Sequence, residues 1–319
     1  MWRLTTNGGD TDPDTWGVTT GSGSNVHQAP TLVISTFAYT TSQATTCTNA
    51  SPCKVGPIMT APTLTQDDTH NLWLYFGTGR YFTSGDKANV DIQHFYGVKD
   101  CIVSGACTDQ TVERNNLFNS SNVVTCASCA DGTNVSTTGS TSSFTVGFSS
   151  GGGNLVNSIQ NMDGWFTTFN DPTAPLQTPP RSAMASGERN LSPATLLGGT
   201  VFFTTFIPSA DICHPTGSGQ LYAVYYLTGG PYTASAIGIV TSGSNTLTAK
   251  SISLGQGLPT QMQIHVGAEL PTSYVPPTPG DCTGSRVIGI TQTSTGAAAV
   301  TCLKPARAFY SRMVSWRDL

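Results

Sequence analysis

The chain is dominated by short runs of apolar and aromatic residues, separated by Gly, Pro, Ser and Thr. The runs are six to nine residues long and rich in β-branched and aromatic side chains, as β-strands are. No window shows the 3.6-residue apolar spacing of an amphipathic helix. The pattern therefore predicts strands at QHFYGVKD (93–100), GWFTTF (164–169), TVFFTTFIP (200–208), GQLYAVYYL (219–227), MQIHVG (262–267), RVIGITQT (286–293) and AFYSRMVSW (308–316).

One further run, LWLYFGTGRYF at 72–82, holds two apolar stretches joined by Gly77, Thr78 and Gly79. Two apolar stretches around a short glycine-containing linker are typical of a β-hairpin. The run therefore predicts a strand, a tight turn and a second strand.

A phrase in which Pro is followed by Thr or Ala opens several strand groups, at Pro30, Pro62, Pro193 and Pro259. Pro is tolerated at the first residue of a strand, because no ladder hydrogen bond is lost there. Repeating blocks of short strands predict a propeller or a sandwich array. The ending LYAVYYLTG (221–229) looks like the propeller repeat of quinoproteins. We therefore expect an all-β fold with a polar loop insertion at 101–160.

Composition removes several classes of protein. The 319 residues include 34 Gly and 19 Pro but only 14 basic and 18 acidic residues, a poor composition for a helical bundle, a coiled coil or a doubly wound α/β fold. The net charge of −4 lacks the basic patch that nucleic-acid binding requires. No apolar run approaches the roughly 18–20 residues that cross a bilayer. The first residues do not resemble a signal peptide, and we expect a piece of a longer exported protein.

Nine cysteines point to an oxidising compartment, because most of them form close pairs in polar loops. The predicted disulfides are Cys47–Cys53, Cys101–Cys107, Cys126–Cys129 and Cys282–Cys302, which leaves Cys213 without an assigned partner. Zinc binding by the four cysteines between 101 and 129 is the alternative. The five residues between Cys101 and Cys107 exceed the usual zinc spacing and favour disulfides.

Asp10, Asp12 and Asp14 have the D-x-D-x-D spacing that begins many calcium loops. Alternate carboxylates can converge on a cation that takes six to eight oxygen ligands. Thr15 and Gly21 stand where an EF-hand has Gly and Glu. Both a calcium site and a solvated acidic turn beside Trp16 remain open.

The remaining chemistry-bearing patterns are weak. The segment 147–151 fits the G-x-S-x-G pattern of a nucleophile elbow, but Gly152 and Gly153 follow where a helix is required. The five histidines are scattered, and no phosphate-binding or dinucleotide motif occurs. We expect no catalytic residue and no cofactor other than calcium.

Several landmarks resemble the C-terminal β-propeller domain of the PilC/PilY family of type IV pilus tip adhesins and assembly factors. They occur in the family's order and span nearly the whole chain. They are MWRL (1–4), LWLYFGTGRYF (72–82), QHFYGVKD (93–100), GWFTTF (164–169), GERNLSPATLLGGTVFFTTFIPSADIC (187–213) and SWRDL (315–319).

The resemblance implies one modified propeller domain over 1–319, displayed at the pilus tip or the outer cell surface and lacking upstream blades. Its implied role is non-enzymatic pilus biogenesis and surface adhesion. The implied partners are pilins and minor pilins, a host or abiotic surface, and the N-terminal remainder of the same tip protein. The family's calcium loop would lie before Met1. Glu188 and Arg189 match a phrase of this family, and we expect them to brace adjacent strands by charge-assisted hydrogen bonds. Trp73, Trp165 and Trp316 are large aromatic residues that we expect to pack between blades, with carbohydrate or surface contact by an exposed Trp as the alternative.

Two other functions remain open. A quinoprotein-type propeller enzyme would carry adjacent cysteines around its cofactor, and the chain has no Cys-Cys pair. The absorbance of a bound quinone would identify such an enzyme. A structural element of an extracellular filament or coat fits the low charge, and electron microscopy would separate a repeated coat protein from a single tip protein.

Overall fold

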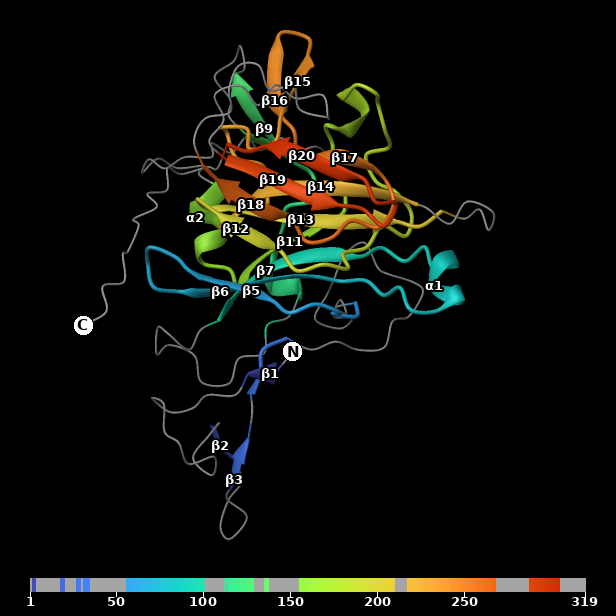
Figure 1. The fold of residues 1–319 in the computed structure, drawn as a ribbon. Helices are drawn as coiled ribbons and strands as arrows, with labels where there is room; N and C mark the ends of the chain where they lie inside the picture. Colours follow the sequence, from blue (N-terminus) through green and yellow to red (C-terminus); the bar gives the residue numbers. More distant parts are fainter. Residues whose placement is uncertain are drawn as a thin grey trace, which may run out of the picture.

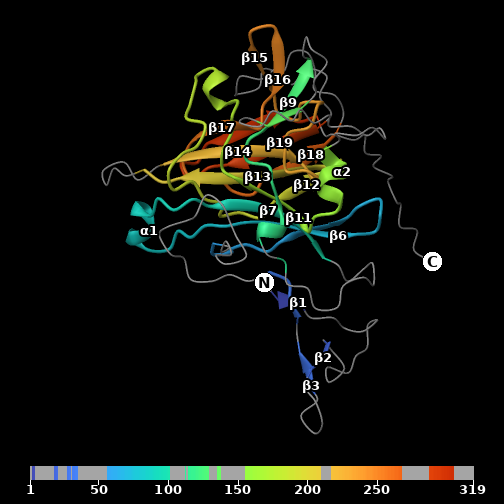
Figure 2. The same cartoon turned by 180° about the vertical axis from the view of Figure 1, so that it is seen from behind.

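The structure is a computed structural model that describes residues 56–100, 112, 114–128, 135–137, 155–209, 217–267 and 287–304, with short segments at 2–3, 18–20, 27–29 and 31–34. The described part is mostly β-strand, as the sequence predicts, with its larger sheets lying one above another (Figures 1 and 2). No helix in these ranges is long and apolar enough to cross a membrane.

Three sheets form the body of the molecule. The first has the order β5-β6-β7-β11-β8, with β5 (Thr63–Gln66), β6 (Leu72–Gly77), β7 (His94–Asp100), β8 (Phe118–Asn119) and β11 (Gly164–Thr168). The second has the order β12-β13-β14-β17, with β12 (Thr195–Leu197), β13 (Thr200–Ile207), β14 (Ser218–Tyr225) and β17 (Ser251–Gln256). The third has the order β18-β19-β20, with β18 (Gln263–Val266), β19 (Val287–Gln292) and β20 (Ala298–Cys302).

Smaller elements surround this body. A further sheet has the order β10-β9-β16-β15, with β9 (Val123–Ser128), β10 (Val135–Thr137), β15 (Ile239–Ser242) and β16 (Asn245–Thr248). Two short ladders pair β1 (Trp2–Arg3) with β4 (Thr31–Leu32), and β2 (Val18–Thr20) with β3 (His27–Ala29). The helices of the described ranges are α1 (Ser84–Ala88), α2 (Leu155–Gln160), and the 3₁₀ turns η4 (Arg114–Asn116) and η5 (Ala174–Leu176).

The central strands are apolar on both faces because their sheets are covered on both sides. Successive side chains of a strand point to opposite faces. In β13, Phe203 therefore packs toward the first sheet, where its ring stacks on Phe95 with centroids 3.8 Å apart. Its neighbour Phe202 packs toward the third sheet, with Met262 and Val287. The second sheet is thus buried between the other two.

The face of the first sheet that points away from the second is also covered. Leu74 and Phe76 of β6 and Tyr96 of β7 belong to a separate core cluster. Ile34 and Val112 also belong to this cluster and form an isolated parallel bridge with each other.

The first strand of the hairpin predicted at 72–82 is present, but the prediction of a second strand there is wrong. The run LWLYFG forms β6, but the chain leaves the sheet after Gly77, and β6 pairs with β7 instead. Thr78 and Gly79 bond to His94 and Pro57 through their backbone N–H groups, so the turn is held by residues outside the run. Tyr81 packs edge-on against Phe206 of β13 rather than joining the ladder.

The two α-helices correct the expectation of an all-β chain. In α1, the Thr83 side chain and the Asp86 carboxylate form a capping box. In α2, Leu155 and Ile159 are buried at the i, i+4 spacing of one helix face. The ammonium of Lys99 donates to the carbonyls of Ile159, Gln160 and Met162, and so satisfies the C-terminal end of α2. Both helices are too short to show periodicity in the sequence.

The Pro phrases mark the first strand of a sheet, as predicted. β5 begins at the residue after Pro62, and β12 begins two residues after Pro193. The phrases also join neighbouring sheets: the Thr63 hydroxyl donates to the Ala194 carbonyl at 2.8 Å. The Thr195 hydroxyl in turn donates to the Met262 carbonyl at 2.7 Å. The first strands of the three sheets therefore lie side by side.

Part of the predicted insertion at 101–160 is built into the sheets. β8 pairs in parallel with β11, and β9 pairs with β16. Residues 101–111 and 138–154 of this segment lie outside the described residues.

Candidate functional site: a buried polar latch

Asp171, three residues after the end of β11, is the centre of a concentrated polar network in the described part of the chain. The loop from 170 to 184 is closed at its base by a bridge between Asn170 and Met184. Just inside this closure, Asp171 is fully buried. Its Oδ1 accepts from the backbone N–H of Thr173 at 2.8 Å and from the Thr173 hydroxyl at 2.6 Å, which is an Asx turn.

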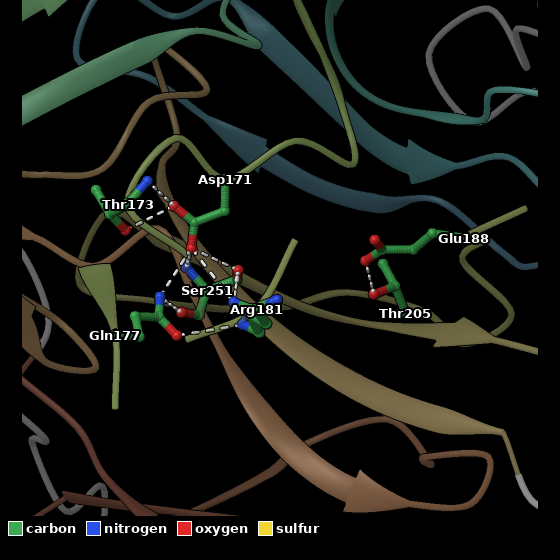
Figure 3. Close-up of polar contacts among 7 residues, drawn as sticks. All are labelled: Asp171, Thr173, Gln177, Arg181, Glu188, Thr205 and Ser251. Carbon is green, nitrogen blue, oxygen red and sulfur yellow. Dashed lines mark hydrogen bonds and ion pairs between the residues drawn. The ribbon is translucent and has the colours of Figure 1, made fainter. Parts of the chain in front are cut away.

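The second oxygen of Asp171 reaches across to the outer strand of the second sheet. Oδ2 accepts from the backbone N–H of Ser251 at 3.0 Å and from its hydroxyl at 2.7 Å. Gln177 and Arg181, both in the same loop, donate to Oδ2 at 3.0 and 3.3 Å. Both also bond Ser251, Gln177 at its carbonyl and Arg181 at its hydroxyl. We call Asp171, Thr173, Gln177, Arg181 and Ser251 the latch (Figure 3).

Glu188 lies beside the latch and is also buried (Figure 3). The Thr205 hydroxyl of β13 donates to its carboxyl, and Tyr222 of β14 is bonded to it as well. Burial raises the pKa of Glu188 to about 7, although these two hydrogen bonds and Arg181 act to lower it. Glu188 therefore braces two adjacent strands, which confirms the role that the sequence assigned to it.

Lys250 is the third buried ionisable group at this site, after Asp171 and Glu188. Its ammonium donates to the carbonyls of Ser120 and Ser121 at 3.2 and 3.0 Å, and to the Thr167 hydroxyl at 2.9 Å. Burial lowers the pKa of Lys250 to about 7, while the carboxylate of Asp171 acts to raise it. Lys250 thus joins β17 to β11 and to the turn before β9.

Arg189 braces a loop rather than the adjacent strands that the sequence analysis assigned to it. Its guanidinium donates to the carbonyls of Arg80, Asp86 and Asn89, each at 2.7 Å, and to that of Gly187 at 2.8 Å. The planar guanidinium suits this fixed fork of acceptors. The loop that carries α1 is therefore held in shape by a side chain from outside it.

The latch stabilises the structure and offers no group for catalysis. A carboxylate saturated by backbone, hydroxyl, amide and guanidinium donors has no lone pair directed at a substrate. The donors come from the loop itself and from β17, so the latch fixes the loop at 170–184 to the edge of the second sheet. Among the described residues, no three His, Cys, Asp or Glu side chains converge to hold a metal ion.

The residues predicted to bind calcium or to form disulfides lie mainly outside the described ranges. Asp10, Asp12 and Asp14 are outside them, and the calcium site stays a prediction. Cys126 in β9 and Cys302 in β20 are each disulfide-bonded. The other cysteines are outside the described residues, so the four predicted pairings also stay predictions; they are Cys47, Cys53, Cys101, Cys107, Cys129, Cys213 and Cys282.

Trp73 and Trp165 pack between sheets, as large aromatic packing residues do. Trp73 and Trp165 are buried in the cluster between the first and second sheets. The indole N–H of Trp165 donates to the Tyr226 carbonyl at 2.8 Å. Trp316 lies outside the described residues, as does the segment 147–151.

The sequence analysis missed Asp171 and Lys250. Asp171-Pro172-Thr173 has the composition of an Asx turn, which was a usable local signal. Lys250 gave no signal, because an isolated lysine between polar residues is normally exposed. Its acceptors come from residues about 80 and 130 positions away in the chain.

No protein-family model matches the chain. The type IV pilus biogenesis factor PilY1 homolog of Xylella fastidiosa is 26% identical over 181 residues, which are 56% of this chain and 12% of that protein. The chain thus corresponds to a small part of this relative. Among solved structures, the C-terminal domain of Pseudomonas aeruginosa PilY1 matches with a TM-score of 0.48 and 16% identity, over 81% of this chain and 46% of that one.

The described residues define a mostly β-strand protein whose buried charges hold its loops and sheets together. Its sequence is PilY1-like, similar to a type IV pilus biogenesis factor. This similarity confirms the resemblance that the sequence landmarks predict.

Proposed function

We propose that the chain is a non-enzymatic module for type IV pilus biogenesis and surface adhesion. The observation that carries this proposal is the 26% identity over 181 residues to a PilY1 homolog. The latch adds support, because it uses the buried charges to fix a loop onto a sheet. Binding loops on a rigid scaffold are a common basis of adhesion.

We propose further that the sheets are blades of a partial, modified β-propeller. Three features support this architecture: the meander order of the second and third sheets, the apolar packing between successive sheets, and the first strands lying side by side. In this proposal residues 1–319 form one domain, with 101–160 as an insertion stapled by disulfides. The match to only 12% of the PilY1 homolog supports a longer tip protein of which this chain is one part.

The proposed location is the pilus tip or the outer cell surface, reached through an oxidising compartment. The two disulfide-bonded cysteines of the described ranges suit such a route. The proposed partners are pilins and minor pilins, the N-terminal remainder of the same protein, and a host or abiotic surface. Calcium binding at Asp10, Asp12 and Asp14 is part of the proposal.

The test is deletion of the gene in the bacterium that carries it, followed by electron microscopy and an adherence assay. We expect few or no surface pili, restored by the wild-type gene. Gold-labelled antibody to the chain should mark filament tips. Normal piliation and adherence in the deletion strain would overturn the proposal. Label repeated along a filament would indicate the coat protein instead, and quinone absorbance of the purified protein would indicate an enzyme.

A further inference from the structure

A pocket of about 500 Å³ lies between the second and third sheets, beside the segments that lead into β12 and β18. Its walls come from residues 191–192 and 258–260, and from the β19–β20 turn at 292–296. Small-molecule sites commonly measure about 300–1,000 Å³. The pocket is separate from the latch and shares no residue with it.

Hydrogen bonds across the pocket hold its walls in place. Leu258 and Ser294 are bonded twice: the Leu258 N–H donates to the Ser294 hydroxyl, and the Ser294 N–H donates to the Leu258 carbonyl, both at 2.9 Å. The Thr260 N–H donates to the Gln292 carbonyl at 2.8 Å. The Ser192 hydroxyl ties the second-sheet wall to the Pro259 carbonyl at 3.2 Å. A site with fixed walls loses little conformational entropy on binding.

The lining residues of the pocket are uncharged, and they are either aliphatic or polar. Leu191, Leu258 and Pro259 supply aliphatic surface, and no lining residue is acidic, basic or a histidine. The polar part consists of serine and threonine hydroxyls and the exposed side chain of Gln292. The backbone of these walls is already paired across the pocket, which leaves it poorly suited to adding a peptide strand.

We propose that this pocket binds one or two sugar units of an uncharged glycan. The Ser294 hydroxyl accepts from the Leu258 N–H and still has a proton to donate, whereas the Ser192 and Thr260 hydroxyls donate to the Pro259 and Gln261 carbonyls and can only accept from a ligand. The exposed Gln292 amide can donate and accept at once, and together these groups match the paired hydroxyls of a sugar. The aliphatic wall matches the C–H face of a pyranose ring. A charged ligand would find no counter-charge here and would lose hydration. The inference rests on the proposed adhesion function, for which it names a ligand class.

The experiment is a screen of the purified chain on an array of uncharged oligosaccharides of glucose, galactose, mannose and N-acetylglucosamine, with sialylated and sulfated glycans on the same array. The best uncharged binder is then titrated by calorimetry. We expect binding that changes little with added salt, because no charges line the pocket. Gln292→Ala should weaken it by about tenfold or more, the effect of losing a bidentate pair of hydrogen bonds.

Gln263→Ala is the matched control, because Gln263 is an exposed glutamine on the neighbouring strand β18 and does not line the pocket. Its affinity should equal that of the wild type. Both variants replace exposed side chains, so circular dichroism should show both folded. Failure of every uncharged glycan to bind would overturn the inference, as would equal binding by Gln292→Ala. Binding confined to sulfated or sialylated glycans would also overturn it.

This result is separable from that of the proposed function. Cells complemented with Gln292→Ala should carry a normal number of pili and adhere less to a surface coated with the bound glycan. Loss of piliation in the deletion strain together with no glycan binding would retain the pilus function and reject the pocket.

Discussion

At the scale of single residues, His70 carries the clearest local strain. Its φ is +67°, and it is the one non-glycine residue of the described ranges with a positive φ. The left-handed region costs an ordinary L-residue roughly 1–2 kcal/mol. The turn imposes this conformation because Asp67 accepts hydrogen bonds from the backbone of Thr69 and Asn71, on either side of His70.

We predict that His70→Gly stabilises the protein by about 0.5–1 kcal/mol, since glycine relieves the strain but gains freedom in the unfolded chain. Urea denaturation monitored by tryptophan fluorescence measures the change. The control is Ala297→Gly, because Ala297 is exposed and has no positive φ. This variant should be destabilised by a similar amount, about 0.5–1 kcal/mol. Equal destabilisation by both variants would contradict the prediction.

Glu188 should make stability depend on pH. Its folded pKa of about 7 lies above its ordinary value of 4.5, so the folded state binds more protons between these values. The stabilisation is therefore complete below pH 4.5 and lost as pH rises through 7. Between pH 5 and 8 the titration of Glu188 should lower the unfolding free energy of the wild type by about 2–3 kcal/mol. We predict that the Glu188→Gln variant lacks this decrease.

The measurement is the difference between wild-type and Glu188→Gln unfolding free energies across this range. The difference is required because His94 acts in the opposite direction: burial holds its pKa well below the usual value, so it favours the folded state as pH rises toward 6.5. Parallel curves for the two proteins would show that Glu188 does not titrate in this range.

At the scale of elements, the latch decides whether the loop at 170–184 stays on the second sheet. We predict that Asp171→Ala destabilises the protein by about 3–5 kcal/mol, because it leaves Arg181 without its buried carboxylate and several donors without an acceptor. Trypsin should then cleave after Arg181 far faster than in the wild type.

Asp91→Ala is the control for this prediction, because Asp91 is only partly buried and bonds within the α1 loop. It should change cleavage at Arg181 little. An Asp171→Ala protein with wild-type stability and protease resistance would show that the latch does not hold the loop.

The sequence predicted the elements that their own apolar pattern marks. It missed the features that depend on contacts with residues far away in the chain. Strands such as β13 and β14 are apolar on both faces, and this marks a buried strand wherever it occurs. The stretch at 80–82 is equally aromatic, but its backbone lies outside the sheet. The guanidinium of Arg189, about 100 residues later, binds the Arg80 carbonyl there. Likewise Glu188 carried a family signal, whereas Lys250 is defined only by acceptors from other elements.

At the scale of the whole molecule, aromatic stacking between the first and second sheets should make them unfold together. Phe203 is buried between Phe95 and Tyr222, with centroid distances of 3.8 and 5.0 Å. We predict that Phe203→Ala costs about 3–5 kcal/mol and shifts a single unfolding transition.

Phe82→Ala provides the comparison, since Phe82 is 73% exposed. It should alter stability by no more than about 0.5 kcal/mol. Calorimetry and tryptophan fluorescence should give the same transition for Phe203→Ala. Two separate transitions would mean that the sheets are independent units.

The external hold of Arg189 on the α1 loop has an evolutionary consequence. Because the Arg189 guanidinium and the Asp86 carboxylate bind the loop, the outward side chains at Phe82 and Val90 do not determine its shape. These positions can therefore vary in evolution while the scaffold beneath them is inherited unchanged.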